Sequence, residues 1–415
     1  MTSRERFQRA INKQQADRVC VDFGATSATG IMAGVLHQLR CAVLKEKNYR
    51  VKVCEPMQML GEIDDTLRQA LGIDVVGVFP PRNILGFENK DWKPFTLFDG
   101  TEVLVPRNFN VKSDGKGGWF IFPQGDMTVP PSGLMPKGGY YFDAICRQEP
   151  IDENNLNPAD NLEEFTLLSA DDIKAMAEQA HIAVQKNLGT ILALPGASFG
   201  DIALVPAPWM KRTKGIRDIE EWYISTVARK NYVFKVFEGQ CEIALKNLQL
   251  LIDALGDKIQ AVFTTAADFG TQTGLLISPK TYEELYKPFH KMINDCIHKK
   301  TKWKIFIHSC GAVKELIPDF IDVGFDIFNP VQSSAAGIDP AELKKKFGRD
   351  LVFWGGGIDT QNVLPFGTPD EVYKQAVERI RILNNPPGFV FSATGNIQTG
   401  TPIENILAVF KAVFS

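Results

Sequence analysis

The stretch KIFIHSCGAVKELIPDFIDVGFDIFNPV, residues 304–331, contains two short apolar runs separated by a segment of helical period. The first run ends on His308 and Cys310, and the second on Asn329 and Pro330. The segment between them ends on Gly324, a residue type favoured just beyond a helix C-terminus. Strand, helix and strand in this order are typical of a βαβ unit with parallel strands. This stretch therefore predicts an α/β fold.

The same alternation extends through most of the chain. Helical segments begin with N-cap signals at Ser278-Pro279 and Thr368-Pro369. The predicted strands cover residues 19–24, 75–79, 191–197, 261–270, 304–310, 326–331, 351–357 and 389–395. Eight parallel strands with helices between them, in a chain longer than the typical barrel of about 250 residues, predict a TIM (β/α)8 barrel. A doubly wound sheet is the alternative, but no strand-to-helix turn carries its glycine fingerprint.

Two segments account for the extra length of the chain. Residues about 83–145 combine β-type runs with turn signals such as Asp99-Gly100 and Asp114-Gly115, and are interpreted as a β-meander inserted after the second strand. Residues about 199–229 form a long connection that we interpret as a lid-like loop. With these additions, residues 1–415 are expected to form one barrel domain.

Composition narrows the function further. The chain has 46 Lys+Arg and 49 Asp+Glu, a net charge of -3, and no basic tract, which disfavours nucleic acid and anionic membranes as partners. Its apolar runs are strand-sized and its N-terminus, MTSRERFQRA, is charged, so neither a signal peptide nor a spanning helix is predicted and a cytoplasmic location is expected. Seven scattered cysteines are interpreted as reduced thiols.

His308 and Cys310 are the first candidates for chemistry. Side chains alternate along a strand, so these two should face the same way, at the strand end where barrels carry their active sites. Imidazole and thiolate are both zinc ligands, and a catalytic zinc takes three protein ligands and an open position. The competing interpretation is a cysteine packed as a small hydrophobe beside an ordinary histidine.

Other strand ends also carry polar residues or glycines. Asp268 and Asp22 are candidate general acid–base groups or metal ligands, although an Asp at a strand end often caps the next turn. Expected substrate contacts are Phe23, Gly24, Gln272, Asn329, Gln332, Asp359, Asn396 and Gln398. The amides among them alternatively tie loops together, and Asp359 alternatively caps the following helix. The aromatic residues Phe353, Trp354 and Phe391 are expected in the core. Four histidines in helical segments are expected to be structural or exposed: His37, His181, His290 and His298.

Several long stretches together resemble a known family. They are FIHSCGAVKELIPDFIDVGFDIFNPVQSSAAGIDPAELKKKFG, LVFWGGGIDTQNVL, NIQTGTPIENILAVFKAV, DRVCVDFGATSATGI and ADFGTQTGLLISPKTYEELYKPFHK. These stretches resemble the uroporphyrinogen decarboxylase (URO-D) superfamily, with closer likeness to its cobamide-dependent methyltransferase branch. The resemblance covers most of the chain outside the insertion, and it implies a TIM barrel.

The resemblance also implies a chemistry. In the methyltransferase branch, a His-x-Cys pair after one strand and a Cys after the last strand bind zinc, and a separate corrinoid protein presents its cobalt at the barrel mouth. By position, His308 and Cys310 are the first two ligands. The third would fall near Gly395 or Asn396, where this chain reads SATGNIQTGTP and has no Cys. Asp268 is the nearest replacement by strand order, and Asp22 and Asp359 are weaker ones.

The resemblance thus implies a methyltransferase that moves a methyl group between a small methylated compound and a corrinoid protein, assisted by zinc. A decarboxylase-like lyase acting on a carboxylated substrate is the first alternative. It is disfavoured because GATSATGIMAG, residues 24–34, has no basic residue where the decarboxylases carry arginines that hold carboxylates. Arg82, Lys211 and Arg212 are interpreted as surface groups. A non-catalytic corrinoid-binding protein is the second alternative, and a homodimer is the expected assembly.

Overall fold

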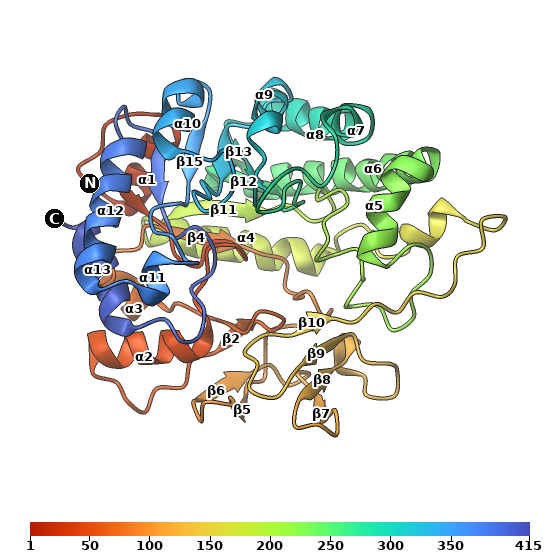
Figure 1. Cartoon of the computed structure of the whole chain (residues 1–415), viewed down its shortest axis with the longest axis horizontal. Coiled ribbons are helices and arrows are strands. Elements are labelled where there is room, and N and C mark those ends of the chain that lie inside the picture. The colour runs from red at the N-terminus through yellow and green to blue at the C-terminus, as the bar shows by residue number, and fades with distance from the viewer.

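The computed structural model describes residues 1–415, and its centre is a parallel sheet of eight strands wound into a nearly closed barrel (Figure 1). The order is β1-β16-β15-β14-β13-β12-β11-β4, and the amide of Asp74 donates to the carbonyl of Val21 across 2.8 Å where the two ends meet. The strands are β1 (Cys20–Val21), β4 (Val75–Val78), β11 (Gly189–Ala193), β12 (Ala261–Thr265), β13 (Lys304–His308), β14 (Ile327–Asn329), β15 (Val352–Trp354) and β16 (Phe389–Phe391). All eight predicted strands are present, and the TIM barrel prediction is confirmed.

The barrel interior is filled with side chains. Helix α1 (Ser3–Ile11) contributes Phe7, which packs edge-on against Trp354 with ring centroids 5.4 Å apart. The same buried cluster includes Cys20, Val75 and Ala261, at or near the first residues of their strands. Helix α1 therefore covers the N-terminal end of the barrel. We therefore expect an accessible active site at the opposite, C-terminal end of the strands, where barrel enzymes carry their chemistry.

Helices surround the sheet, as the helical periods predict. They include α4 (Ala170–Gln185), α6 (Lys230–Leu255), α8 (Lys287–Lys300), α9 (Ile317–Asp322), α10 (Pro340–Phe347), α12 (Pro369–Leu383) and α13 (Ile403–Val413). The predicted caps are present: Ser278 Oγ accepts the amide of Thr281, and Thr368 Oγ1 accepts that of Glu371. Five residues in π-helical form (Tyr282–Tyr286) separate the short helix α7 (Pro279–Thr281) from α8. No helix combines the length and apolar character needed to cross a membrane.

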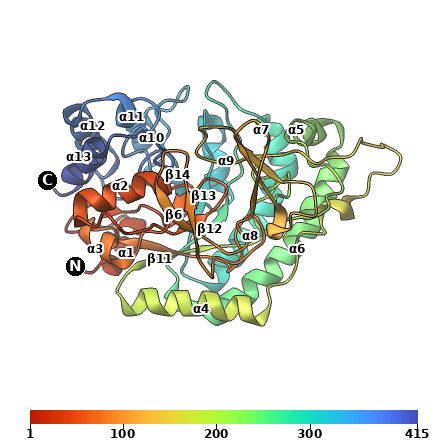
Figure 2. The ribbon, with the colours of Figure 1, turned by 90° about the horizontal axis from the view of Figure 1, so that it is seen from below.

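The predicted β insertion is also present after the second barrel strand. It comprises a hairpin of β5 (Lys93–Thr96) and β6 (Glu102–Val105) and an antiparallel meander of β7 (Val111–Ser113), β8 (Trp119–Ile121), β9 (Gly133–Met135) and β10 (Asp143–Ala144). These strands gather on one side of the molecule in Figure 1 and lie in front of the barrel in Figure 2.

The chain between the first two barrel strands holds elements that the sequence analysis did not separate. They are α2 (Ala33–Leu44), α3 (Asp65–Ala70) and a hairpin of β2 (Val53–Glu55) and β3 (Leu60–Gly61). The chain around this hairpin contacts the insertion: Val51, before β2, accepts the amide of Leu104, and Met57, between β2 and β3, accepts that of Phe142.

The segment predicted as a lid begins with irregular chain from residue 199 to 218 and ends in α5 (Ile219–Ala228). It contacts the insertion and the chain just after it. The guanidinium of Arg147 donates to the carbonyls of Ala207 and Met210, and Lys211 forms an ion pair with Asp126 at 2.7 Å. The two additional segments of the chain are therefore joined to each other.

Candidate active site

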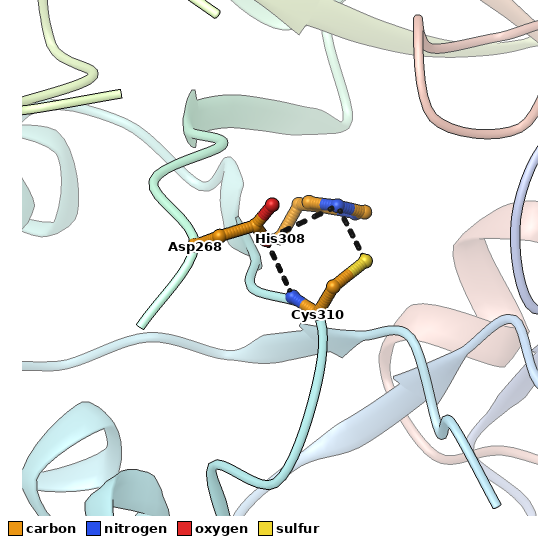
Figure 3. A group of neighbouring side chains, drawn as sticks. All are labelled: Asp268, His308 and Cys310. Atoms are coloured by element: carbon orange, nitrogen blue, oxygen red, sulfur yellow. Dashed lines mark hydrogen bonds and ion pairs between the residues drawn. The ribbon is translucent and has the colours of Figure 1, made fainter. Parts of the chain in front are cut away.

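Three polar side chains converge where β12 and β13 end. Asp268 follows β12, His308 is the last residue of β13, and Cys310 lies two positions further on. Cys310 Sγ is 3.3 Å from His308 Nε2, and Asp268 Oδ1 is 3.9 Å from the same nitrogen. All three donor atoms lie within 4.8 Å of one another (Figure 3). His308 and Cys310 thus face the same way, as their spacing predicts.

Backbone contacts hold the two loops together at this point. The amide of Cys310 donates to Asp268 Oδ1 over 2.7 Å. Ser309, whose position between the two implies the opposite face, accepts the amide of Phe269 through Oγ at 3.0 Å. The close approach depends on Gly311, which has a φ of +90°, and a Cβ there would lie 2.5 Å from the carbonyl carbon of Gly270.

The site is partly shielded from solvent. The side chain of His308 is 11% exposed and that of Asp268 is 26% exposed. Burial, with a smaller contribution from the negative charge of Asp268, raises the pKa of the Cys310 thiol well above its ordinary value. Without a nearby positive charge this thiol is protonated at neutral pH, so Cys310 is a poor nucleophile by itself. A bound cation would favour its thiolate form.

Asn329 and Gln332, predicted as substrate contacts, bind protein groups. Asn329 Oδ1 hydrogen-bonds His308 Nδ1, and Asn329 Nδ2 donates to the carbonyl of Trp354 at 2.8 Å. Gln332 Oε1 accepts the amide of Gly311 at 2.8 Å. Asn329 therefore supports the His308 ring, and Gln332 supports the loop that carries Cys310.

Asp22 is fully buried after β1. Its Oδ1 accepts the amide of Ala25 and its Oδ2 accepts Trp354 Nε1, both at 2.9 Å. Burial raises the pKa of Asp22 to about 6, and the hydrogen bonds oppose that rise. Asp22 is not one of the three residues that converge at the ends of β12 and β13.

The other predicted contacts are distributed around the barrel end. Phe23 is buried in the core against Phe391 and Phe410. Asp359 accepts the amides of Gln361 and Asn362 and so caps the turn before α11 (Val363–Phe366).

Asn396 ties the first and last barrel loops together. Its Oδ1 accepts the amide of Gly30, and its Nδ2 donates to Ser27 and Gln58. Gly24, Gln272 and Gln398 are exposed. None of these residues lies in the group formed by Asp268, His308 and Cys310.

Two residues near the site come from the segment predicted as a lid, and the sequence analysis did not select them. Asp201 is buried and accepts the hydroxyl of Ser198 at 2.9 Å, while the hydroxyl of Tyr223 donates to the carbonyl of Asp268 at 3.0 Å. Burial raises the pKa of Asp201 to about 6; Asp268 adds to the rise and His308 opposes it. The signal for Asp201 was an Asp soon after the third strand, the pattern that marked Asp268.

Fold and site together define a barrel protein with a polar centre at the C-terminal ends of its strands. Residues 158–415 match the family model described as uroporphyrinogen decarboxylase (URO-D). Because this match covers more than half of the chain, the protein belongs to the URO-D family.

Relatives from Methanosarcina mazei refine the comparison. A region of 170 residues, 39% of this chain, is 28% identical to a methylated-thiol–coenzyme M methyltransferase and spans 42% of that protein. A solved methyltransferase structure from the same organism superposes with a TM-score of 0.55 at 15% identity, over 100% of this chain and 98% of that one. The second comparison shows likeness of fold.

Proposed function

We propose that this protein is a methyltransferase that moves a methyl group between a small methylated compound and a corrinoid protein, with a metal ion held by Asp268, His308 and Cys310. The observation that carries the proposal is the convergence of carboxylate, imidazole and thiol at the C-terminal end of the barrel. Support comes from the URO-D family match and from the partial identity to a methylated-thiol methyltransferase.

The donor set fits a zinc-like cation. Zinc–ligand bonds of about 2.0 to 2.3 Å in a tetrahedral arrangement separate neighbouring ligand atoms by about 3.3 to 3.8 Å. The separations of 3.3 Å between Cys310 Sγ and His308 Nε2, and of 3.9 Å between His308 Nε2 and Asp268 Oδ1, are close to this range. Three protein ligands would leave one position for a substrate, the pattern of catalytic zinc. Asp268 is proposed as the third ligand, in place of the cysteine that this chain lacks near Gly395.

A metal at this position supplies Lewis acidity, which polarises an ether, amine or thiol. The chain contributes the rest. His308 offers Nε2 and Cys310 offers sulfur, while Asp268 brings a negative charge and accepts the Cys310 amide. Tyr223, through its bond to the Asp268 carbonyl, connects the proposed lid to the site. We propose that residues 199–229 cover the substrate and exclude water during the reaction.

The charges near the site disfavour the carboxylated-substrate lyase. The charged groups that shift the pKa of Asp201 are Asp268 and His308, and the one that shifts the pKa of Cys310 is Asp268. Arg82 and Arg212 are exposed, and Lys211 is paired with Asp126. A substrate with several carboxylates would meet carboxylates here and not the guanidinium donors that hold such groups.

Two further expectations belong to this proposal. The corrinoid protein is the expected partner at the barrel mouth, and a cytoplasmic homodimer is the expected assembly. A non-catalytic corrinoid-binding role is the alternative; it predicts complex formation without methyl transfer.

Metal analysis and methyl transfer test the proposal separately. Purified protein should contain about one zinc per chain, and His308→Ala and Cys310→Ser should each lose it. Cys296→Ser, which changes a cysteine on α8, is the control and should keep the metal. Methyl donors are then screened with reduced cobalamin by absorbance. Equal metal content in the wild type and the three variants would exclude a metal ion at His308 and Cys310. Absence of methyl transfer from every donor would favour the non-catalytic corrinoid-binding role.

A further inference from the structure

A chain of buried hydrogen bonds runs from His308 through the barrel to β1. His308 Nδ1 bonds Asn329 Oδ1, Asn329 Nδ2 donates to the Trp354 carbonyl at 2.8 Å, and Trp354 Nε1 donates to Asp22 Oδ2 at 2.9 Å. The four residues come from β13, β14 and β15 and from the end of β1. Each residue, counting backbone and side chain together, is at most 8% exposed.

The order of atoms in this chain fixes the proton on the imidazole. The Trp354 carbonyl only accepts hydrogen bonds, so Asn329 must turn its NH2 group toward it. The oxygen of the same amide then faces His308 and only accepts. His308 must therefore donate from Nδ1, and its neutral ring carries the lone pair on Nε2. That lone pair lies on the side of Cys310, 3.3 Å from the sulfur.

We propose that Asn329 is a positioning residue that holds His308 in the Nδ1–H tautomer before any ligand binds. The inference goes beyond the proposed function, because it concerns the metal-free protein and holds whatever group the site transfers. It also gives Asn329 a role other than the substrate contact predicted from the sequence.

A steric observation supports the role of Asn329. Gly355 follows Trp354 with a φ of +81°, and a Cβ there would lie 2.7 Å from Asn329 Nδ2. Only glycine both adopts this backbone conformation easily and leaves room for the amide. The indole of Trp354 is held on its other sides by Phe7 and Phe306, with ring centroids at 5.4 and 5.1 Å. The peptide that carries the Trp354 carbonyl is held separately, because the amide of Gly355 in the same peptide donates to the carbonyl of Val390 at 3.1 Å.

Nitrogen NMR of the metal-free protein tests the proposal directly. The His308 signals are assigned by their loss in His308→Ala, and ¹⁵N shifts distinguish a protonated ring nitrogen from one with a free lone pair. The wild type should show protonated Nδ1 and free Nε2. A wild-type ring protonated at Nε2 would overturn the proposal without any variant, and irrespective of methyl transfer.

Variants then test the cause. Asn329→Leu has no acceptor for the ring and should give a mixture of tautomers. It should also weaken Co²⁺ binding about 10- to 100-fold, as is typical when the hydrogen-bond partner of a ligating histidine is lost. Asn329→Asp keeps an oxygen that accepts from the ring and should keep Nδ1 protonated, although its carboxylate has no donor for the Trp354 carbonyl.

Asn405→Leu removes another buried amide, which donates to the carbonyls of Leu364 and Gly367, and is the matched control. It should leave the His308 signals unchanged. A folded Asn329→Leu protein that keeps the wild-type tautomer would reject the role of Asn329.

Discussion

The amide of Cys310 donates to Oδ1 of Asp268 over 2.7 Å, so the loops after β12 and β13 are joined where their side chains converge. This bond holds the carboxylate beside the sulfur and the imidazole, although Asp268 and Cys310 are far apart in the sequence and are not covalently bonded. It also explains how an Asp 42 positions away in the chain can complete a site that His308 and Cys310 begin.

Asp268→Asn should lower metal affinity. The amide oxygen can still accept the Cys310 N–H, so the loop contact persists while the negative charge is lost. The expected loss exceeds the roughly 10- to 100-fold typical of partners outside the ligand set. Competition titration with a chromogenic chelator measures it. Asp359→Asn, which changes a turn cap at another strand end, should bind the metal like the wild type; equal losses in the two variants would contradict the assignment.

Gly311→Ala should destabilise the protein more than Gly400→Ala. Both glycines have a φ near +90°, which costs a non-glycine residue about 1 kcal/mol or more. A Cβ at position 400 meets nothing within 4 Å, whereas one at position 311 would lie 2.5 Å from the backbone of Gly270. The free energy of unfolding in urea measures both variants. Their difference isolates the close approach of the two loops, and no difference would show that the loops can separate freely.

Acid should destabilise the wild type through His290. Burial lowers the pKa of His290 to about 3 from an ordinary 6.5, so below pH 6.5 the unfolded chain takes up a proton that the folded one does not. Stability is therefore lost as the pH falls from about 6.5 toward 3. The loss through this group is about 2 kcal/mol at pH 5 relative to neutral pH.

His290→Phe should remove this part of the pH dependence, although the hydroxyl of Tyr282 then loses its partner. Urea unfolding at pH 5 and pH 7 measures the change. His181→Gln, at an exposed position on α4, should keep the wild-type dependence. An unchanged slope in His290→Phe would mean that other groups cause the acid sensitivity.

Arg217 should anchor the proposed lid. Its guanidinium pairs with Glu164 at 2.6 Å, with side chains 1% and 5% exposed. Removing one member of a buried pair leaves the other charge buried, and Arg217→Met should therefore cost about 3 kcal/mol. Lys214→Met breaks the exposed pair with Glu163 in the same segment and should cost less than about 1 kcal/mol. The double variant Arg217→Met/Glu164→Leu should recover much of the loss. The free energy of unfolding in urea measures these costs. Equal costs for Arg217→Met and Lys214→Met would refute the role of Arg217 as an anchor.

The barrel itself was predictable from local patterns. Strands buried on both faces are short apolar runs, and helices around them show caps and a 3.6-residue period, so eight strands could be located one by one. The hairpin of β2 and β3 escaped because its strands are only three and two residues long. The common orientation of His308 and Cys310 was also predictable, since alternation along a strand is local.

The partners of these two residues were less accessible to sequence analysis. Asp268 was selected by strand order, but Asp201 reaches the site from irregular chain and Tyr223 from helix α5, which follows it. Asn329 resembled a substrate contact in the sequence. Its role depends on the carbonyl of Trp354, which belongs to the neighbouring strand and is not visible as a side-chain motif.

The eight-stranded barrel, the insertion and the shared face of the imidazole and thiol could be predicted without coordinates, because each depends on residues close together in the chain. The folded chain was needed to place Asp268 beside them, to show that Asn329 orients His308, and to bring Asp201 and Tyr223 to the same place through the connection after β11. Those relationships arise from packing between strands and loops far apart in sequence, where distance and direction are set by the closed barrel.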